Sequence, residues 1–336
     1  MAEHTNSSNV TYTDFIDYSS IKEAIRVQGA ITIVIAIVGT TLNLWFLAAM
    51  LSLADVRSRL RNKIICSSFV LHLISGTIIL PVIGCYELIS FSISCVQHSI
   101  LAHLYFITEL ISNWQLVMLL AVFLAQIMDF DPTSKLSSGA ATLGTIGLLV
   151  LPWAASLVIV PVITHEYWKY SPYQYYDCHN IHPDSMDAFR SLDTAVPIVL
   201  AIVLLIIATY FKYRRFNLRN SSQSMHVELI GRGPEIDNTC VYVLAIAVSI
   251  VCDLPQLLMT FDVSLYQTNQ IVKWYITVIV ANLMNDIRVI LMPITWLLLP
   301  DIRQRIKTWR PWYRPAPGID LTMTYAKETA AAESDG

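Results

Sequence analysis

Charged residues are scarce in this sequence. Of its 336 residues, 14% are charged and 55% are hydrophobic, whereas about 25% of the residues in an ordinary soluble domain are charged. The 22 basic and 25 acidic residues leave a formal net charge of only −3. This balance excludes the broad positive surface that nucleic-acid binding requires, so we expect no nucleic-acid partner. A chain this apolar requires a lipid bilayer as its first partner.

Glycines and membrane-buried histidines are also few. The chain has 11 glycines, whereas transporters and channels more often contain inverted repeats or broken spans rich in glycine and proline. Of the eight histidines, only His72 lies deep in an apolar segment. A membrane hydrolase needs several histidines and carboxylates around a metal ion. We therefore predict no enzyme activity, no metal site and no cofactor.

Lysine and arginine are missing from several stretches that are long enough to cross a bilayer. A membrane helix needs about 20 predominantly apolar residues. Seven segments meet this requirement: Gly29–Leu53, Ile64–Tyr86, Ile100–Met128, Gly139–Ile163, Thr194–Phe211, Thr239–Phe261 and Trp274–Leu299. The sequence therefore predicts an all-α membrane protein, with a seven-transmembrane helix bundle over residues 29–299.

The distribution of basic residues predicts the direction of this bundle. Basic residues accumulate in cytoplasmic loops, and an extracellular N-terminus places 16 of the 22 on the inner side. Residues 1–28 then form an extracellular tail at the plasma membrane, in which Asn6 and Asn9 are candidate glycosylation sites. These residues lack the basic start and apolar core of a signal peptide, so we expect the first span to be an uncleaved anchor.

The chain that follows the seventh span predicts a helix on the membrane surface. Ile302, Ile306 and Trp309 recur at helical spacing and basic residues surround them. Residues 300–310 are therefore expected to form a basic amphipathic helix on the inner leaflet. Residues 311–336 are polar and are expected to form a disordered cytoplasmic tail.

Several landmarks occur in an order and spacing typical of one receptor family. They are Asn43 in the first span, Trp153 in the fourth, Pro197 in the fifth, Cys252-Asp253-Leu254-Pro255 in the sixth and Met292-Pro293-Ile294-Thr295-Trp296 in the seventh. With these landmarks the sequence resembles the rhodopsin-like (class A) G-protein-coupled receptors. The resemblance implies a receptor that transmits the binding of an extracellular ligand to a heterotrimeric G protein or arrestin. It also implies bending of the helices at Pro255 and Pro293, and a second receptor as a dimer partner.

The chain departs from this family at its activation motifs. Leu124-Ala125-Gln126 stands where the family has Asp-Arg-Tyr, so Ala125 replaces the arginine that reaches toward the G protein. His72 and Met292 replace residues of the family's sodium site, and Asp253 replaces the aromatic switch of the sixth span. A second interpretation therefore stays open: an atypical or decoy receptor-like protein that binds a ligand or partner receptor without activating a G protein. A chemosensory receptor is the third.

Five ionisable residues lie within the predicted spans: His72, Glu109, Asp253, Asp286 and Arg288. An unpaired charge at such depth costs about 2.5 kcal/mol or more, so we expect these side chains to face the bundle and find partners. The family pattern places Asp253 beside Arg288, which predicts a buried ion pair. A neutral, hydrogen-bonded Asp253 is the alternative. We expect Glu109 to be a satisfied structural group between helices.

Asn282, Asn285 and Asp286 share one face of the seventh span, because residues three and four apart are neighbours on a helix. We expect this face to line the central cavity, either as ligand contacts or as polar contacts between helices. Amine receptors carry an aspartate in the outer half of the third span, and residues 105–108 contain none. The resemblance therefore disfavours biogenic amines, while acidic and aromatic residues in the outer segments favour a peptide ligand.

The chain contains six cysteines. The resemblance implies a disulfide that ties the second outer loop to the top of the third span, in an oxidising compartment. Cys178 lies in that loop, and Cys95 is the first candidate partner, with Cys85 the second. The remaining cysteines are expected to be small buried apolar residues.

Overall fold

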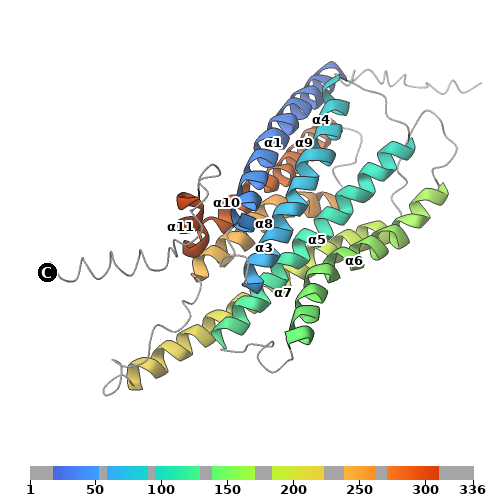
Figure 1. The fold of residues 1–336 in the computed structure, drawn as a ribbon. Coiled ribbons are helices and arrows are strands. Elements are labelled where there is room, and N and C mark those ends of the chain that lie inside the picture. Colours follow the sequence, from blue (N-terminus) through green and yellow to red (C-terminus); the bar gives the residue numbers. More distant parts are fainter. Residues whose placement is uncertain are drawn as a thin grey trace, which may run out of the picture.

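The computed structural model describes residues 18–52, 59–89, 95–128, 138–170, 184–222, 238–261 and 271–309. Every regular element in these ranges is a helix (Figure 1). The helices are α1 (Tyr18–Ser52), α3 (Leu60–Ile74), the π-helical turn η1 (Ser75–Ile79), α4 (Leu80–Ile89), α5 (Cys95–Ile127), α6 (Ser138–Tyr170), α7 (Asp184–Ser222), α8 (Thr239–Phe261), α9 (Ile271–Asp286), α10 (Arg288–Trp296) and α11 (Pro300–Thr308).

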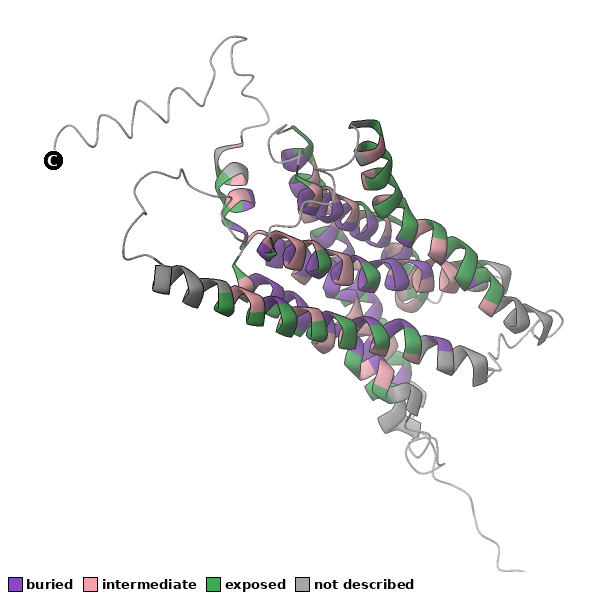
Figure 2. Ribbon diagram, turned by 90° about the horizontal axis from the view of Figure 1, so that it is seen from below, coloured by how far each residue is buried: buried purple, intermediate pink, exposed green. Residues whose placement is uncertain are grey.

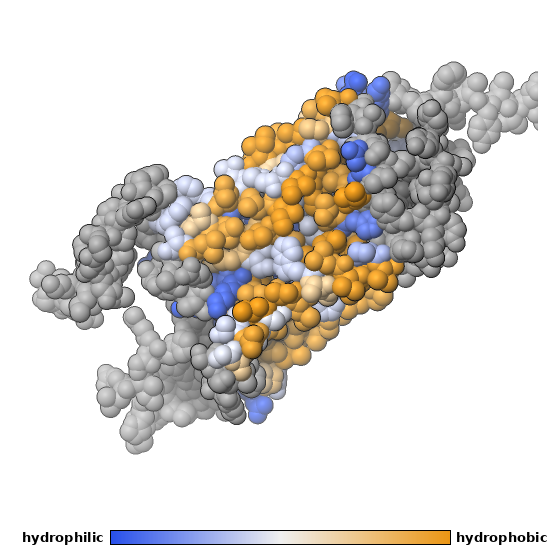
Figure 3. All heavy atoms as spheres, turned by 45° about the vertical axis from the view of Figure 1, so that its right-hand side comes forward, coloured by the Kyte–Doolittle hydropathy of each residue, from blue (hydrophilic) through white to orange (hydrophobic). Residues whose placement is uncertain are grey.

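Seven helical segments in the described part of the chain are long and apolar enough to cross a membrane, which confirms the predicted number. They are Ile21–Ser52, Leu60–Ile89, Ile100–Ile127, Thr142–Ile163, Ser191–Arg214, Thr239–Leu258 and Tyr275–Trp296. Hydrophobic side chains cover much of the face drawn in Figure 3. In each segment the buried residues face the neighbouring helices, and many exposed residues are large and apolar (Figure 2). This is the surface expected of a multi-pass membrane protein.

The first span begins earlier than the sequence predicted. α1 starts at Tyr18 rather than at Gly29, so the last part of the expected tail is helical. Its first turns mix apolar residues with Lys22, Glu23 and Arg26, so they contain no continuous apolar stretch. Ile21 is nevertheless buried. The helical spacing of a few apolar side chains, rather than an unbroken run of them, holds this turn in the helix.

The second span contains a π-helical turn just before Pro81. A proline has no N–H to donate and its ring clashes with the carbonyl four residues back. Here the turn η1 widens, and the Leu80 N–H donates to the Ser75 carbonyl, five residues back. Beyond this turn α4 runs along α1, where Gln28 Nε2 donates to Glu87 Oε1 over 2.8 Å.

Two glycines allow α1 and α4 to approach closely. A Cβ atom added to Gly29 would lie 2.7 Å from the Gly84 carbonyl oxygen, and one added to Gly84 would lie 2.7 Å from a side-chain carbon of Ile33. Small residues at helix interfaces in membranes permit such backbone contact. The contact fixes the end of α4 against α1, where Glu87 lies one turn further along.

The seventh span is divided into α9 and α10 at Ile287, and its proline is compensated by another helix. Pro293 cannot donate to the Val289 carbonyl, which would be left without its helical partner. Asn43 of α1 supplies the missing donor, with Nδ2 at 2.9 Å from the Val289 oxygen. The same Nδ2 lies 2.8 Å from the Gly39 carbonyl of its own helix. The two family landmarks Asn43 and Pro293 thus form one contact.

A helix is present where the surface helix was predicted, and its apolar side chains pack against the bundle. Ile302 of α11 is fully buried in the main apolar core, and Ile306 packs against that core. Asp301 forms ion pairs with Arg59, at 3.2 Å, and with the buried Arg61. Trp309 meets Trp45 of α1 edge to face. The apolar stripe of α11 therefore serves largely as contact with the bundle.

The main apolar core lies at the end of the bundle that carries α11, which we call the α11 end. Its buried members come from α1, α3, α5, α7, α8, α10 and α11. At its centre Phe123 of α5 stacks on Tyr242 of α8, with ring centroids 4.2 Å apart. Tyr242 in turn meets Trp296 of α10 at 6.2 Å. These three rings join three helices at the α11 end.

Candidate functional site

The centre of the bundle holds the ion pair that the sequence led us to propose. Arg288, the first residue of α10, directs Nη1 at both carboxylate oxygens of Asp253 in α8, at 2.8 and 3.0 Å. Both side chains are buried. The break between α9 and α10 at Ile287 places Arg288 on the face that meets α8. Removing one partner of such a buried pair strongly destabilises a protein, because the other charge is left without compensation.

The second guanidinium nitrogen of Arg288 extends this pair into a network. Nη2 lies 2.6 Å from Asn113 Oδ1 on α5 and 3.3 Å from Ser249 Oγ on α8. Asn113 Nδ2 donates to the Asp193 carbonyl of α7 at 3.4 Å. That carbonyl is the one that Pro197 leaves without a helical donor. Hydrogen bonds therefore connect α5, α7, α8 and α10 through a single arginine.

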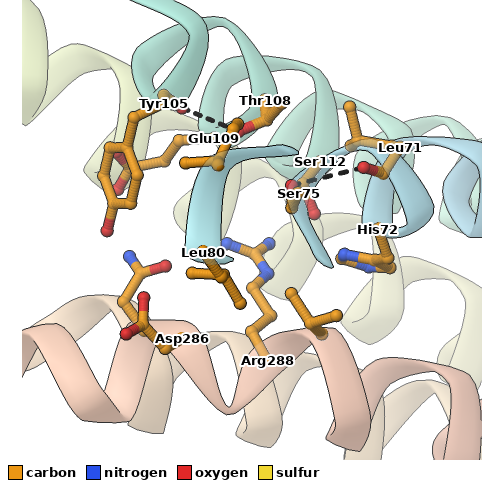
Figure 4. Close-up of a pocket in the computed structure, with 13 residues that line it drawn as sticks. Leu71, His72, Ser75, Leu80, Tyr105, Thr108, Glu109, Ser112, Asp286 and Arg288 are labelled. Carbon is orange, nitrogen blue, oxygen red and sulfur yellow. Dashed lines mark hydrogen bonds between the residues drawn. The ribbon is translucent and has the colours of Figure 1, made fainter. Parts of the chain in front are cut away.

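A small cavity lies beside this network. Its volume is about 40 Å³, which holds no more than a few water molecules. Figure 4 places Tyr105 and Asp286 on one side of it, His72 on the other and Arg288 between them. Three buried atoms of its lining have no hydrogen-bond partner among the described residues: His72 Nε2, Glu109 Oε2 and Arg288 Nε. Buried polar groups are rarely left unpaired, so the cavity is a place where a bound molecule would satisfy them.

A larger cavity of about 240 Å³ lies farther from the α11 end. Its lining comes from five helices, α1, α4, α5, α8 and α9, and consists of Gln28, Ile83, Tyr86, Glu87, Leu101, Ala102, Tyr105, Phe106, Gln256, Asn282 and Asp286. Tyr105 and Asp286 line the small cavity as well. The two cavities are therefore adjacent, with Asp286 between them.

The predicted polar face of the seventh span does line these cavities. Asn282 and Asp286 border the larger cavity, and Asn285 and Asp286 border the smaller one. Gln256 of α8 connects the face to the sixth span, because its Nε2 donates to Asn282 over 3.4 Å and its Oε1 accepts from Asn285 over 3.1 Å. Asp286 accepts a hydrogen bond of 2.9 Å from Thr32 Oγ1 of α1. The face thus lines the cavities and makes polar contacts between helices, and its role as a ligand contact stays a prediction.

Glu109 does not fit the expectation that it is a satisfied structural group. It is buried, but its Oε2 has no partner among the described residues. The expectation treated a buried carboxylate as one whose hydrogen bonds are complete. It is wrong here because Glu109 lies at the small cavity, where no described side chain or backbone group donates to its buried Oε2.

The remaining predicted residues lie apart from the cavities. Pro255 is half-buried inside α8, two residues after Asp253. The stretch Leu124–Gln126 is half-buried near the α11 end of α5 and contains no basic residue. Cys85 is an exposed free cysteine. Asn6, Asn9 and Cys178 lie outside the described residues, as does the side chain of Cys95, so glycosylation and the disulfide stay predictions.

Several residues of the site escaped the sequence analysis. Asn113 lies four residues after Glu109 and shares its helix face, a spacing that offered a signal. Glu87 follows the predicted end of the second span by one residue, so it fell outside the spans in which ionisable residues were sought. Gln28 and Thr32 are uncharged residues of α1 that gave no signal, because their carboxylate partners are far away in the sequence.

No protein-family model matches the chain, and a search of curated proteins finds no match to it. Among the described residues, no group of three His, Cys, Asp or Glu side chains is arranged to hold a metal ion. The fold, the geometry of the cavities and the ion pair are therefore the features from which a function can be inferred.

Proposed function

We propose that the chain is a multi-pass receptor of the plasma membrane, similar to the rhodopsin-like receptors, that transduces an extracellular ligand. The observation that carries the proposal is the place of the larger cavity, which lies between five helices and is bordered by Asp286. Asp286 is two residues away from Arg288, which joins α5, α8 and α10. A ligand in this cavity would contact helices whose relative positions the arginine network holds.

The direction of the bundle follows from the charges. Arg59, Arg61 and the exposed basic residues Arg303 and Lys307 lie at the α11 end. The rule that basic residues remain in the cytoplasm places this end inside, with α11 at the inner leaflet and the cavities toward the outside. Asn6 and Asn9 then lie in an extracellular segment, and the ligand enters from outside.

The mechanism is a shift between two arrangements of the helices. A ligand changes that equilibrium only by binding one arrangement more tightly than the other. Pro255 lies two residues from Asp253, and Pro293 lies five residues from Arg288. Bending at either proline would therefore change the distance and orientation between these two charged side chains. The ring contacts of Tyr242 with Phe123 and Trp296 at the inner end would then separate and offer a different surface to a G protein or arrestin.

The test is a recruitment panel for G proteins and arrestin in cells that express the full chain. Epitope tags at the N- and C-termini of the chain, detected on intact and on permeabilised cells, establish the direction. The double substitution Asn6→Gln and Asn9→Gln should remove any glycan. Basal or ligand-driven recruitment by the wild-type chain supports the proposal. An N-terminal tag that is accessible only after permeabilisation would overturn the direction on which it depends.

A second function is favoured by one specific observation. The inner end of α5 carries Leu124, Ala125 and Gln126, and none of these is basic. A receptor-like protein that binds a ligand or partner receptor without activating a G protein fits this end of the helix. Silence of the wild-type chain in the panel, together with recruitment by Ala125→Arg, would select this second function. Recruitment by the wild-type chain would reject it.

A further inference from the structure

Carboxylates surround the two cavities without a matching number of cations. The larger cavity is lined by Glu87 and Asp286, and no described lysine, arginine or histidine lines it. Glu109 borders the smaller cavity next to it. Arg288 is the one described basic residue besides His72 in the smaller lining, and Asp253 already holds it through two hydrogen bonds. Three carboxylates thus face two adjoining cavities.

The partners of these carboxylates are neutral. Glu87 accepts from the Gln28 amide and Asp286 from the Thr32 hydroxyl, at 2.8 and 2.9 Å. Glu87 Oε2 and Glu109 Oε2 have no hydrogen-bond partner among the described residues. Glu109 is only 6% exposed and Asp286 only 5%. An ionised carboxylate is costly within a bilayer without a counter-charge, and a cation in the cavity would supply that charge.

Aromatic side chains complete the site. Tyr86, Tyr105 and Phe106 line the larger cavity together with the two carboxylates. The faces of such rings attract organic cations, which adds to the attraction of a carboxylate. Apolar Ile83 and Leu101 line the same cavity. The chemistry fits a ligand that has a positive group next to an apolar body.

We propose that the larger cavity binds its ligand through a protonated amine or guanidinium group, which lies between Glu87 and Asp286. This inference rests on the proposed receptor function and names the chemical class of its ligand. The sequence disfavoured amines because residues 105–108 of α5 contain no aspartate. In this chain the carboxylates come from α4 and α9 instead, and α5 contributes the aromatic wall. A cation bound at Asp286 lies beside Arg288. Its binding can therefore affect α5 and α8, which the hydrogen bonds of Arg288 connect.

The charge of the cavity is tested without knowing the ligand. Ala102 lines the larger cavity, so Ala102→Cys in a background with Cys85→Ala and Cys240→Ala, which removes the two exposed free cysteines of the described residues, introduces a reactive thiol there. The modification rate is measured with cationic trimethylammonioethyl methanethiosulfonate and with anionic sulfonatoethyl methanethiosulfonate. We expect the ratio of the two rates to exceed that of a free thiol in water by about tenfold or more. Both Glu87→Gln and Asp286→Asn should lower the ratio.

The matched control is Glu23→Gln, which neutralises an exposed carboxylate of α1 that does not line the cavity. It should leave the ratio unchanged. A ratio equal to that of the free thiol, or one that neither Glu87→Gln nor Asp286→Asn lowers, overturns the proposal. Glu87 is only half-buried, so Glu87→Gln keeps the test available if Asp286→Asn fails to fold.

Protection of the Ala102→Cys thiol from modification shows whether the bound cation belongs to a free amine or to a peptide. Tyramine and agmatine represent free amines, tetra-arginine amide represents a basic peptide, and N-acetyltyramine is the neutral match. Slower labelling of Ala102→Cys by a small amine assigns a free amine, and slowing by the arginine peptide alone assigns a peptide. In either case Glu87→Gln should abolish the protection and N-acetyltyramine should give none. Protection by no cation overturns the ligand class.

The result of the protection experiment is independent of the proposed signalling function. Protection without recruitment of any G protein or arrestin keeps the cation site and removes the signalling role. Recruitment without protection keeps the receptor and removes the cation site.

Discussion

The two ends of the bundle share several helices, among them α1, α5 and α8, but are held together in different ways. At the α11 end, buried apolar side chains from seven helices fill the interior, and Tyr242 stacks on Phe123 and meets Trp296 edge to face. At the opposite end the interior contains two cavities and several carboxylates. At the α11 end, which we call the packed end, close packing of apolar side chains joins the helices. At the opposite end, which we call the hollow end, some polar groups have no partner, and a ligand would supply one. Departures from complete pairing are expected where a protein carries function.

The Arg288 network forms the boundary between these two ends. Arg288 binds Asp253 and Asn113 and also borders the small cavity. Substitutions on the two sides of this boundary should therefore differ in their cost, with the largest losses at the network and the smallest at the cavities.

The largest effect is expected from Arg288→Ala. It leaves Asp253 buried without a counter-charge and removes the donor to Asn113, so the free energy of unfolding should fall by about 3–5 kcal/mol. Thermal denaturation in detergent and surface expression measure the loss. The control is Arg303→Ala, an exposed basic residue of α11. A denaturation midpoint equal to that of the wild type would contradict the central place of the network.

Exchange of the two charges refines this prediction. Asp253→Arg combined with Arg288→Asp should recover only part of the expression lost in each single variant. The reason is that Arg288 also donates to Asn113 and Ser249, and an aspartate at position 288 cannot. Full recovery would mean that the pair alone matters. No recovery at all would argue against the pairing.

The next effect is expected from Asn43→Ala, at the contact between α1 and α10. The Val289 carbonyl, released by Pro293, would lose the hydrogen bond from Asn43 and remain buried. An unsatisfied buried carbonyl costs about 1–3 kcal/mol. Thr41→Ala is the matched control, because Thr41 is exposed and bonds within its own helix, to the Ile37 carbonyl. Equal midpoints for the two variants would refute the role of Asn43.

A smaller effect is expected from Phe123→Leu at the packed end. The substitution keeps an apolar side chain but removes the stack on Tyr242, which is worth about 0.5–1.5 kcal/mol. Under the proposed function, the variant should also raise basal recruitment, since the stack helps to keep the inner end closed. Tyr210→Leu changes an exposed aromatic residue of α7 and should do neither. Lower basal recruitment in Phe123→Leu would count against a closing role for the stack.

The sequence predicted the number of spans well, because apolar composition over about 20 residues is a strong local signal. It also led to Asp253 and Arg288, since charges within a membrane need partners. It did not predict Asn113 or the neutral donors of α1. The partners of buried asparagines include backbone carbonyls released by prolines, and which carbonyl meets which asparagine depends on how the helices are placed in three dimensions. The cavities themselves are likewise a property of packing and leave no trace in composition.

The smallest effect is expected from Glu109→Gln, on the hollow side. The carboxylate has an unpaired oxygen at the small cavity, so replacing it by a neutral amide removes a buried charge and breaks no described hydrogen bond of that oxygen. The free energy of unfolding should therefore rise slightly, by about 1 kcal/mol or less. Detergent denaturation beside Glu23→Gln, an exposed carboxylate, measures it. A loss comparable to that of Arg288→Ala would mean that Glu109 supports the fold as the packed end does, and the distinction between the two ends would fail. A gain would indicate that Glu109 is retained for what the cavity binds rather than for stability.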